Sequence, residues 1–142
     1  MGSRINNVIV LKCTPDSFYR MWLEMLTPFH NLANREKDVA ARILLQWSKL
    51  CDSVEDPTVR EEIMWSKKSK LDIRNSLGMS SPFFQSVLRK LRANGVLVDG
   101  DRINPRYIPH LKKDDNGFVL AVMFDFSSTT NPGKPANEAA KD

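Results

Sequence analysis

The stretch NSLGMSSPFFQSVLRKLRANGVLV, Asn75 to Val98, constrains the fold of this chain more than any other segment. A turn containing Gly78 opens it, and Asn94-Gly95 closes it. Between the two turns, apolar residues recur at the three-and-four spacing of one helix face. The residues expected to face inward are Phe84, Val87, Leu88 and Leu91. The stretch therefore predicts a helix with one buried face, and its other face is either a solvated surface or one that reads DNA.

The flanking segments supply a second helix and a hairpin. Ser69 and Asp72 form a capping-box-like pair ahead of the helix KLDIRNSL, which Gly78 ends in a left-handed conformation. The residues expected to be buried in that helix are Leu71, Ile73 and Leu77. Beyond Gly95, VLVDGDRINP predicts two short strands around a turn at Asp99-Gly100. Two short helices joined by a glycine-containing turn and followed by a hairpin describe a winged helix-turn-helix.

The N-terminal segments predict a strand followed by a helix. The run from Ile5 to Cys13 is β-branched and apolar, which favours a strand. Thr14 is a suitable N-cap, Pro15 suits the first helical position, and Pro28 is expected to end the helix. Its expected inner face consists of Phe18, Met21, Trp22, Met25 and Leu26.

Two more helices are predicted before the opening stretch. Asn34 is expected to cap the first, and Asp56 with Pro57 to cap and begin the second. The apolar stripe of the first is Val39, Ile43, Trp47 and Leu50, thickened by Ala40, Leu44 and Cys51. The buried side of the second is expected to hold Val59 and Ile63.

The predicted fold class is α+β, mainly α: a winged helix-turn-helix with additional N-terminal and C-terminal strands. Residues 1–30 form an N-terminal strand and helix as an appendage, and residues 31–126 form the winged helix-turn-helix domain with the C-terminal strand, Gly117 to Phe126. Residues 127–142 lack large apolar side chains and predict a disordered tail. The first and last strands pair with each other or across a homodimer, and either arrangement hides their edges.

Positive charge is concentrated on one segment. From Arg60 to Lys113 the chain holds twelve Lys or Arg and five Asp or Glu, whereas the rest holds nine basic and twelve acidic residues. The net charge of +4 is therefore unevenly distributed, and the basic segment contains the stretch from Asn75 to Val98. Such a concentration is typical of nucleic-acid binders, although a basic protein also carries Lys and Arg on ordinary solvated surfaces.

Other classes of function are disfavoured. Cys13 and Cys51 match no zinc or redox spacing and are expected to be reduced thiols rather than a disulfide, and the two histidines lack neighbouring ligands for a metal. A phosphate-binding glycine loop and a nucleophile with its base are both missing, so we expect no enzyme, no cofactor and no small-molecule substrate. Neither a signal peptide nor a membrane span is evident, which predicts a cytoplasmic protein with no membrane partner.

The segment LGMSSPFFQSVLRKLRANGVLV resembles winged-helix proteins, which have a turn, a serine, a recognition helix ending in Leu-x-x-x-Gly and a wing strand. With GDRINPRYIP after it, the chain from about Asn34 to Pro109 is similar to the RepL-like replication-initiator and regulatory proteins of phages and plasmids. Arg74 departs from the pattern, since the family prefers a small residue there. The resemblance implies binding of double-stranded DNA.

A recognition helix offers its N-terminal and outward residues to base edges in the major groove. The residues expected to read bases are Ser81, Gln85, Ser86 and Arg89. Gln85 suits adenine and Arg89 suits guanine, since each pairs in a bidentate way. Phe83 is expected to be exposed if Phe84 is buried, and it either contacts a thymine methyl group or packs against the preceding helix.

Other basic and hydroxyl side chains are expected to contact phosphates. These are Lys67, Lys68, Lys70, Arg74, Ser80, Lys90, Arg92, Arg102 and Arg106. Together with the resemblance, these residues predict a sequence-specific double-stranded DNA-binding protein of transcription regulation or replication initiation. A homodimer, if one forms, would place two recognition helices on two half-sites. The alternative is a non-enzymatic assembly, structural or protein-interaction module that uses the same fold.

Overall fold

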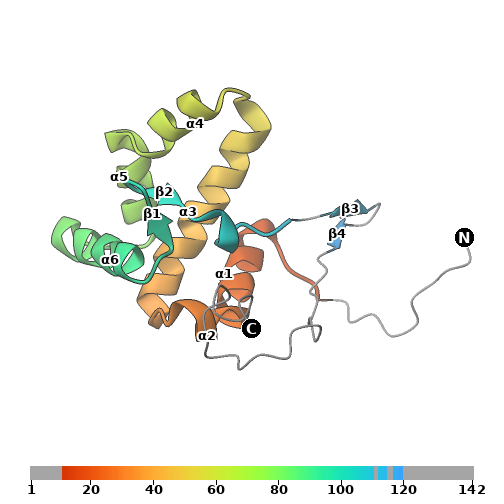
Figure 1. Cartoon of the computed structure of the whole chain (residues 1–142), viewed down its shortest axis with the longest axis horizontal. Helices are drawn as coiled ribbons and strands as arrows, with labels where there is room; N and C mark the ends of the chain where they lie inside the picture. The colour runs from red at the N-terminus through yellow and green to blue at the C-terminus, as the bar shows by residue number, and fades with distance from the viewer. Residues whose placement is uncertain (1–10, 111, 115–116, 120–142) are drawn as a thin grey trace, which may run out of the picture. The chain divides into compact units, whose positions relative to one another are not determined.

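A computed structural model describes residues 11–110, 112–114 and 117–119 of the 142-residue chain. The chain divides into two compact units, Met1–Pro109 and His110–Asp142. The described part of the first, which we call the helical unit, holds helices α1 to α6, a two-stranded antiparallel sheet and a short 3-10 helix (Figure 1). The class is α+β and mainly α, as predicted. The division after Pro109 does not coincide with the boundaries expected at residues 30 and 126.

Helix α1 (Pro15–Met25) begins as the sequence predicts and ends earlier. Thr14 Oγ1 accepts a hydrogen bond from the Ser17 N–H at 3.2 Å, and proline occupies the first turn. Pro28 does not end this helix. It lies in the first turn of α2 (Thr27–His30), where the missing N–H leaves no partner unsatisfied.

The inner face of α1 differs from the predicted one. Tyr19 and Leu23 are buried in the core, and the partly buried residues packed against the core include Phe18, Trp22 and Leu26. Met25, expected to be inside, is 54% exposed. Because α1 packs along α3 and contributes to the same core, residues 15–30 belong to the helical unit and do not form an appendage.

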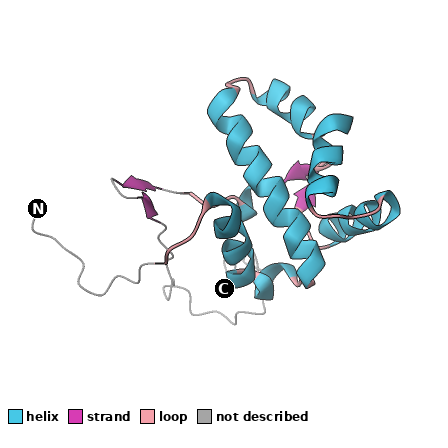
Figure 2. Cartoon of the chain, turned by 180° about the vertical axis from the view of Figure 1, so that it is seen from behind, coloured by secondary structure: helices cyan, strands magenta, loops and turns pink. Residues whose placement is uncertain are grey.

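Helix α3 (Asn34–Ser53) runs through the helical unit and packs against α1, α4, α5 and α6 (Figure 2). Its N-cap is Ala33 rather than Asn34, because the Glu36 carboxylate accepts a hydrogen bond from the Ala33 N–H at 2.9 Å. The predicted apolar stripe is confirmed at Val39, Ala40, Ile43, Leu44 and Leu50. Cys51, expected to thicken it, is exposed.

Helix α4 (Pro57–Met64) starts as predicted, with Asp56 Oδ1 accepting from the Thr58 N–H at 2.9 Å. Its buried residue is Met64, whereas Val59 and Ile63 are 37% and 38% exposed. The predicted inner side was therefore wrong by one residue, a rotation of about 100° on a helix.

Helix α5 (Lys67–Ser76) begins before the predicted position. Ser66 is its N-cap and accepts a hydrogen bond from the Ser69 N–H at 3.2 Å. Ser69 is therefore inside the helix and buried, not its cap. Of the residues expected to be buried, Ile73 is in the core, Leu77 is partly buried and Leu71 is 43% exposed.

Helix α6 (Ser81–Ala93) is followed by β1 (Leu97–Val98), β2 (Arg102–Ile103) and the 3-10 helix η1 (Pro105–Tyr107). The four residues predicted to face inward, Phe84, Val87, Leu88 and Leu91, are all buried. Strands β1 and β2 form the predicted antiparallel hairpin, with Leu97 opposite Ile103 and Val98 opposite Arg102.

The second unit contains β3 (Lys112–Asp114) and β4 (Gly117–Val119), which pair antiparallel. Strand β4 is the start of the predicted C-terminal strand. Residues 120–126 and the expected tail lie outside the described residues. So does most of the predicted N-terminal strand, of which residues 11–13 are described and are not in a strand.

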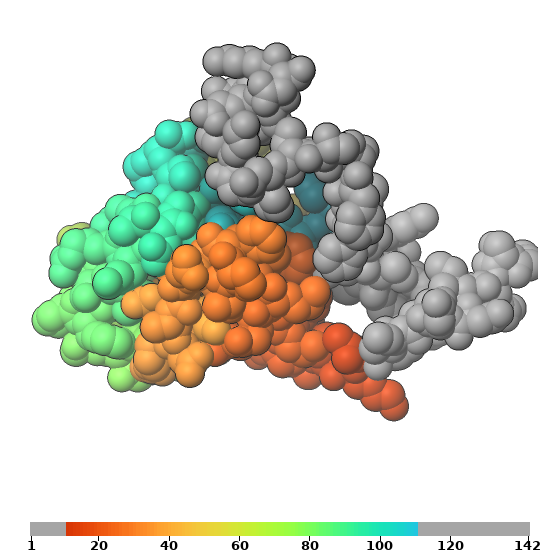
Figure 3. Space-filling model, turned by 60° about the horizontal axis from the view of Figure 1, so that its bottom comes forward, coloured from red at the N-terminus to blue at the C-terminus, as the bar shows by residue number. Residues whose placement is uncertain are grey.

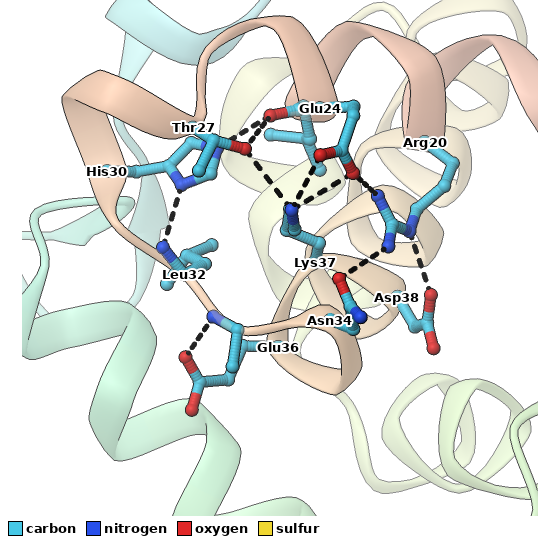
Figure 4. A network of polar contacts seen from close by, with 11 residues as sticks. Arg20, Glu24, Thr27, His30, Leu32, Asn34, Glu36, Lys37 and Asp38 are labelled. Carbon is cyan, nitrogen blue, oxygen red and sulfur yellow. Dashed lines mark hydrogen bonds and ion pairs between the residues drawn. The ribbon is translucent and has the colours of Figure 1, made fainter.

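A polar network ties α1 to the start of α3 (Figure 4). The Lys37 ammonium is almost completely buried and donates to both carboxylate oxygens of Glu24 at 3.0 and 3.1 Å and to Thr27 Oγ1 at 3.2 Å. Arg20 donates to Glu24 at 2.7 Å and to Asp38 at 2.9 Å. Hydrogen bonds hold the pKa of Glu24 below its ordinary value, and the bond from Arg20 has a larger effect than the bonds from Lys37.

His30 forms two hydrogen bonds in the same region. Its ring is buried, and Nδ1 accepts a hydrogen bond from the Leu32 N–H at 3.0 Å. Since Nδ1 is the acceptor, Nε2 carries the hydrogen and donates to the Leu23 carbonyl at 2.8 Å. The histidine is therefore a structural residue that joins α1 to the loop before α3.

Candidate nucleic-acid interface

Helices α5 and α6 are joined by a tight turn at Gly78. The glycine has φ +63°, a left-handed conformation that side chains disfavour. The buried Met79 donates its N–H to the Arg74 carbonyl at 3.1 Å, which satisfies the end of α5. From α3, the Arg35 guanidinium donates to the Leu77 carbonyl at 3.1 Å. The turn is thus held both by its own backbone and by a cation placed at the helix C-terminus, where the helix dipole favours it.

The hairpin is attached to the end of α6 by backbone and amide contacts. Gly95 has φ +78°, and the Val96 N–H returns to the Leu91 carbonyl at 2.9 Å, so the Leu-x-x-x-Gly motif is a helix end. Asn104 donates Nδ2 to the Gly95 carbonyl at 2.8 Å and its own N–H to the Val96 carbonyl at 2.9 Å. These bonds place the hairpin directly beside the last turn of α6.

The residues predicted to read bases lie mostly on the exposed side of α6. Ser81, Gln85 and Arg89 are exposed and follow one another at intervals of four residues, which places them along one side of the helix. Ser86 is only half exposed. Within the described part of the chain, Arg89 forms no ion pair, so its guanidinium is available to a ligand.

The cations among the predicted phosphate contacts fall into three groups. Lys67, Lys70, Arg74 and Lys90 form no salt bridge with any residue that the structure describes. Lys68, Arg92 and Arg102 each have a carboxylate partner: Asp72 at 3.1 Å, Asp101, and Asp99 at 3.2 Å. Arg106 lies over the Phe29 ring, 5.6 Å from its centroid.

Arg106 is positioned by η1 beside α1, since the Trp22 indole N–H donates to the Tyr107 carbonyl at 2.9 Å. It lines a shallow cavity of about 180 Å³ together with Leu26, Phe29 and Tyr107. Its contacts are therefore with α2 and η1, and it is not grouped with the cations of α5 and α6.

Arg92 and Asp101 connect α6 to the hairpin turn. Arg92 Nη2 lies 3.0 Å from Asp101 Oδ2, and Nε contacts the other carboxylate oxygen. The hydrogen bond from Arg92 lowers the pKa of Asp101, and the charge of Lys70 on α5 acts in the same direction. The pKa of Asp101 in the hairpin turn therefore depends on cations from both α6 and α5.

The charge carried by α6 itself has one sign. Between Asp72 and Asp99 the chain contains no acidic residue, and its basic residues there are Arg74, Arg89, Lys90 and Arg92. Five acidic residues lie in α4 or in the segment just before it: Asp52, Glu55, Asp56, Glu61 and Glu62. Figure 3 shows the green surface of α6 continuing into the blue-green surface of the hairpin along one side of the helical unit. A polyanion would meet no carboxylate on α6 itself, and the nearby Asp101 is already paired with Arg92.

The first turn of α6 offers a hydroxyl and an aromatic ring. Ser80 is the N-cap, and its Oγ accepts from the Phe83 N–H at 3.3 Å, which leaves its hydroxyl hydrogen free to donate. Pro82 has no N–H, so the turn offers few backbone donors to an anion. Phe83 is 44% exposed and is not among the residues packed against the core.

No metal-binding group of three His, Cys, Asp or Glu side chains occurs among the described residues, and none of the described helices is long and apolar enough to cross a membrane. No protein-family model, curated protein or solved structure matches this chain.

Proposed function

We propose that this chain is a sequence-specific double-stranded DNA-binding protein that uses α5, the Gly78 turn, α6 and the hairpin as a winged helix-turn-helix. The observation that carries the proposal is the coincidence of shape and charge. The helix that follows the turn carries three cations and no acidic residue, and four of its apolar residues are buried on the opposite side: Phe84, Val87, Leu88 and Leu91. Packing explains the buried face and leaves Arg89 and Lys90 without a structural role.

In the proposed complex, α6 enters the major groove, which is about 12 Å wide and accommodates one helix. Arg89 pairs with guanine through O6 and N7, and Gln85 pairs with adenine through N6 and N7. Ser81 contacts a base or phosphate from the first turn, and Ser86 contributes through its exposed part. These contacts supply the sequence preference.

Cations around α6 supply affinity. Lys67, Lys70 and Arg74 of α5, with Lys90 of α6, contact phosphates on either side of the groove and release their counterions. We assign Arg92 and Arg102 first to holding the hairpin, because each has an aspartate partner. Lys68 must exchange Asp72 for a phosphate, at little cost for so exposed a pair.

The biological role that we propose is transcription regulation or replication initiation. The similarity of residues 34–109 to RepL-like proteins is the basis for this role and for an origin in a phage or plasmid. Both roles require the same recognition of a short duplex site.

Selection from randomised duplex DNA tests the proposal. We expect the recovered sequences to share a short motif that the protein binds at least about tenfold more tightly than a scrambled duplex of equal composition. Recovery of unrelated sequences that bind no better than the starting pool would contradict sequence-specific binding.

A second candidate function, protein interaction, has its own observation. Phe29 and Met25 are 59% and 54% exposed, and Phe29 borders the cavity with Arg106. Exposed apolar side chains beside a cation suit a protein partner. If this surface is the functional one, Phe29→Ala abolishes partner capture while Arg89→Ala does not.

A further inference from the structure

Phe83 is an aromatic side chain for which the fold has no evident use. It lies in the first turn of α6 and is 44% exposed, whereas the neighbouring Phe84 is 2% exposed and fills the core. Phe83 is absent from the residues packed against the core and from the aromatic and cation–π contacts of the described chain. The core and the aromatic contacts of the described chain therefore do not require the Phe83 ring.

The position of Phe83 on α6 relates it to the charged surface. Phe83, Ser86 and Lys90 are spaced three and four residues apart and share one side of the helix. Seven residues separate Phe83 from Lys90, which is about 10 Å along a helix axis. A helix that enters the major groove by its N-terminal end brings Phe83 to the base edges while Lys90 remains near the phosphates.

A phenyl ring has few partners on base edges. It cannot donate or accept a conventional hydrogen bond, and the apolar group that the major groove displays is the 5-methyl of thymine. Adenine and guanine present polar atoms at the corresponding edge, and cytosine has its amino group beside a C5–H in place of the methyl group. The ring would desolvate these polar atoms without replacing their hydrogen bonds.

We propose that Phe83 is a specificity-determining residue that selects thymine through contact with its 5-methyl group. The inference rests on the proposed function, since it requires α6 to occupy the major groove. It adds a thymine to the recognition site, at a position adjacent to the bases read by Gln85 and Ser86.

Uracil substitution tests this contact, because it removes the methyl group and leaves base pairing unchanged. Each thymine of the selected site is replaced singly by uracil, and affinities are measured for wild type and for Phe83→Ala. Wild type should lose about fourfold in affinity at one or two positions, as expected for one buried methyl group. Phe83→Ala should bind the thymine and uracil sites equally.

Leu71→Ala is the matched control, because Leu71 has nearly the same exposure, 43%, but lies on α5. It should retain the full preference for thymine, and circular dichroism should show both variants folded. Specific binding without any thymine in the motif, or equal thymine preference in wild type and Phe83→Ala, would overturn the inference and leave the proposed function standing. Absence of specific DNA binding would overturn both.

Discussion

Arg92 of α6 and Asp101 of the hairpin turn form a two-point ion pair, with Nη2 at 3.0 Å from Oδ2 and Nε on the other oxygen. The pair joins the last turns of the proposed recognition helix to the tip of the hairpin. Asp101 has φ +76°, so the backbone of the turn presents the carboxylate toward α6. Hairpin and helix should therefore move as one body when they meet a ligand.

Asp101→Asn should lower the free energy of unfolding by about 0.2–1 kcal/mol near neutral pH, the range for a partly exposed pair. Because Arg92 lowers the pKa of Asp101, this contribution is complete above the ordinary aspartate pKa and is lost as pH falls through the lowered value. Urea denaturation at a series of pH values, from about 7 downward past the ordinary aspartate pKa of about 3.9, follows this loss.

Asp72→Asn is the control for this pair, because Asp72 and Lys68 are both strongly exposed and their pair should contribute less. If the difference between wild type and Asp101→Asn remained undiminished at the acidic end, the assignment of the stabilisation to the Asp101 carboxylate would be wrong.

Removal of the buried Lys37 charge and removal of its partner Glu24 should affect stability differently. Glu24→Ala leaves the ammonium group with Thr27 as its remaining partner and should cost about 1–3 kcal/mol. Lys37→Met removes the charge and keeps the aliphatic volume, so it should change stability by less than about 1 kcal/mol. Equilibrium unfolding of both variants decides the matter, and a larger loss for Lys37→Met than for Glu24→Ala would refute the account of this network.

The inner face of α6 should dominate the stability of the helical unit. Leu88 has no exposed surface, so Leu88→Ala should cost about 2–5 kcal/mol. Gln85→Ala, on the exposed side of the same helix, should stay within about 0.5 kcal/mol. Denaturant titration compares the two, and a similar loss in both would mean that the helix does not have the orientation described.

The local signals of the sequence were sufficient for α6 and the hairpin. Phe84, Val87, Leu88 and Leu91 form a complete helical stripe between a serine cap and an Asn-Gly end, and Asp99-Gly100 specifies the turn. In such segments periodicity, capping and turn chemistry agree, so the prediction needs no knowledge of the rest of the fold.

The predictions failed where the choice depended on distant packing. On α4, Val59 and Ile63 were as plausible inside as Met64, and only the position of α3 decides among them. A buried lysine was not predicted, because the burial of Lys37 requires Glu24 from α1 and Thr27 from α2. Ser66 and Ser69 are both serines and equally suitable as N-caps, so the sequence alone does not choose between them. Tertiary structure places the start of α5 one helical turn before the predicted position.

The exposure of the candidate residues was predictable from the sequence, whereas their ion pairs were not. Arg89 and Lys90 are exposed as expected. The partners of Arg92 and Arg102 lie across the hairpin turn, and Arg106 contacts a ring more than seventy residues away in sequence. Charge counting treats all such cations alike, whereas the structure separates paired cations from available ones.

One arginine and one lysine substitution should distinguish a residue that reads bases from one that contacts phosphates. Arg89→Ala should reduce discrimination between the selected site and a site altered at one guanine by about 1–3 kcal/mol. Lys67→Ala should weaken binding to all duplexes by a similar factor. Competition binding against a panel of single-base variants measures this, and identical profiles for the two variants would invalidate the assignment of α6 as the recognition helix.

The central claim, that the cationic surface of α5 and α6 binds duplex DNA, is tested most directly by the salt dependence of binding in fluorescence anisotropy. The account predicts that the logarithm of the association constant falls linearly with the logarithm of salt concentration, and that Lys67→Ala reduces the slope by about one. Lys49→Ala, an exposed lysine of α3, should leave the slope unchanged. Weak binding that does not vary with salt, or equal slopes for Lys67→Ala and Lys49→Ala, would contradict the claim.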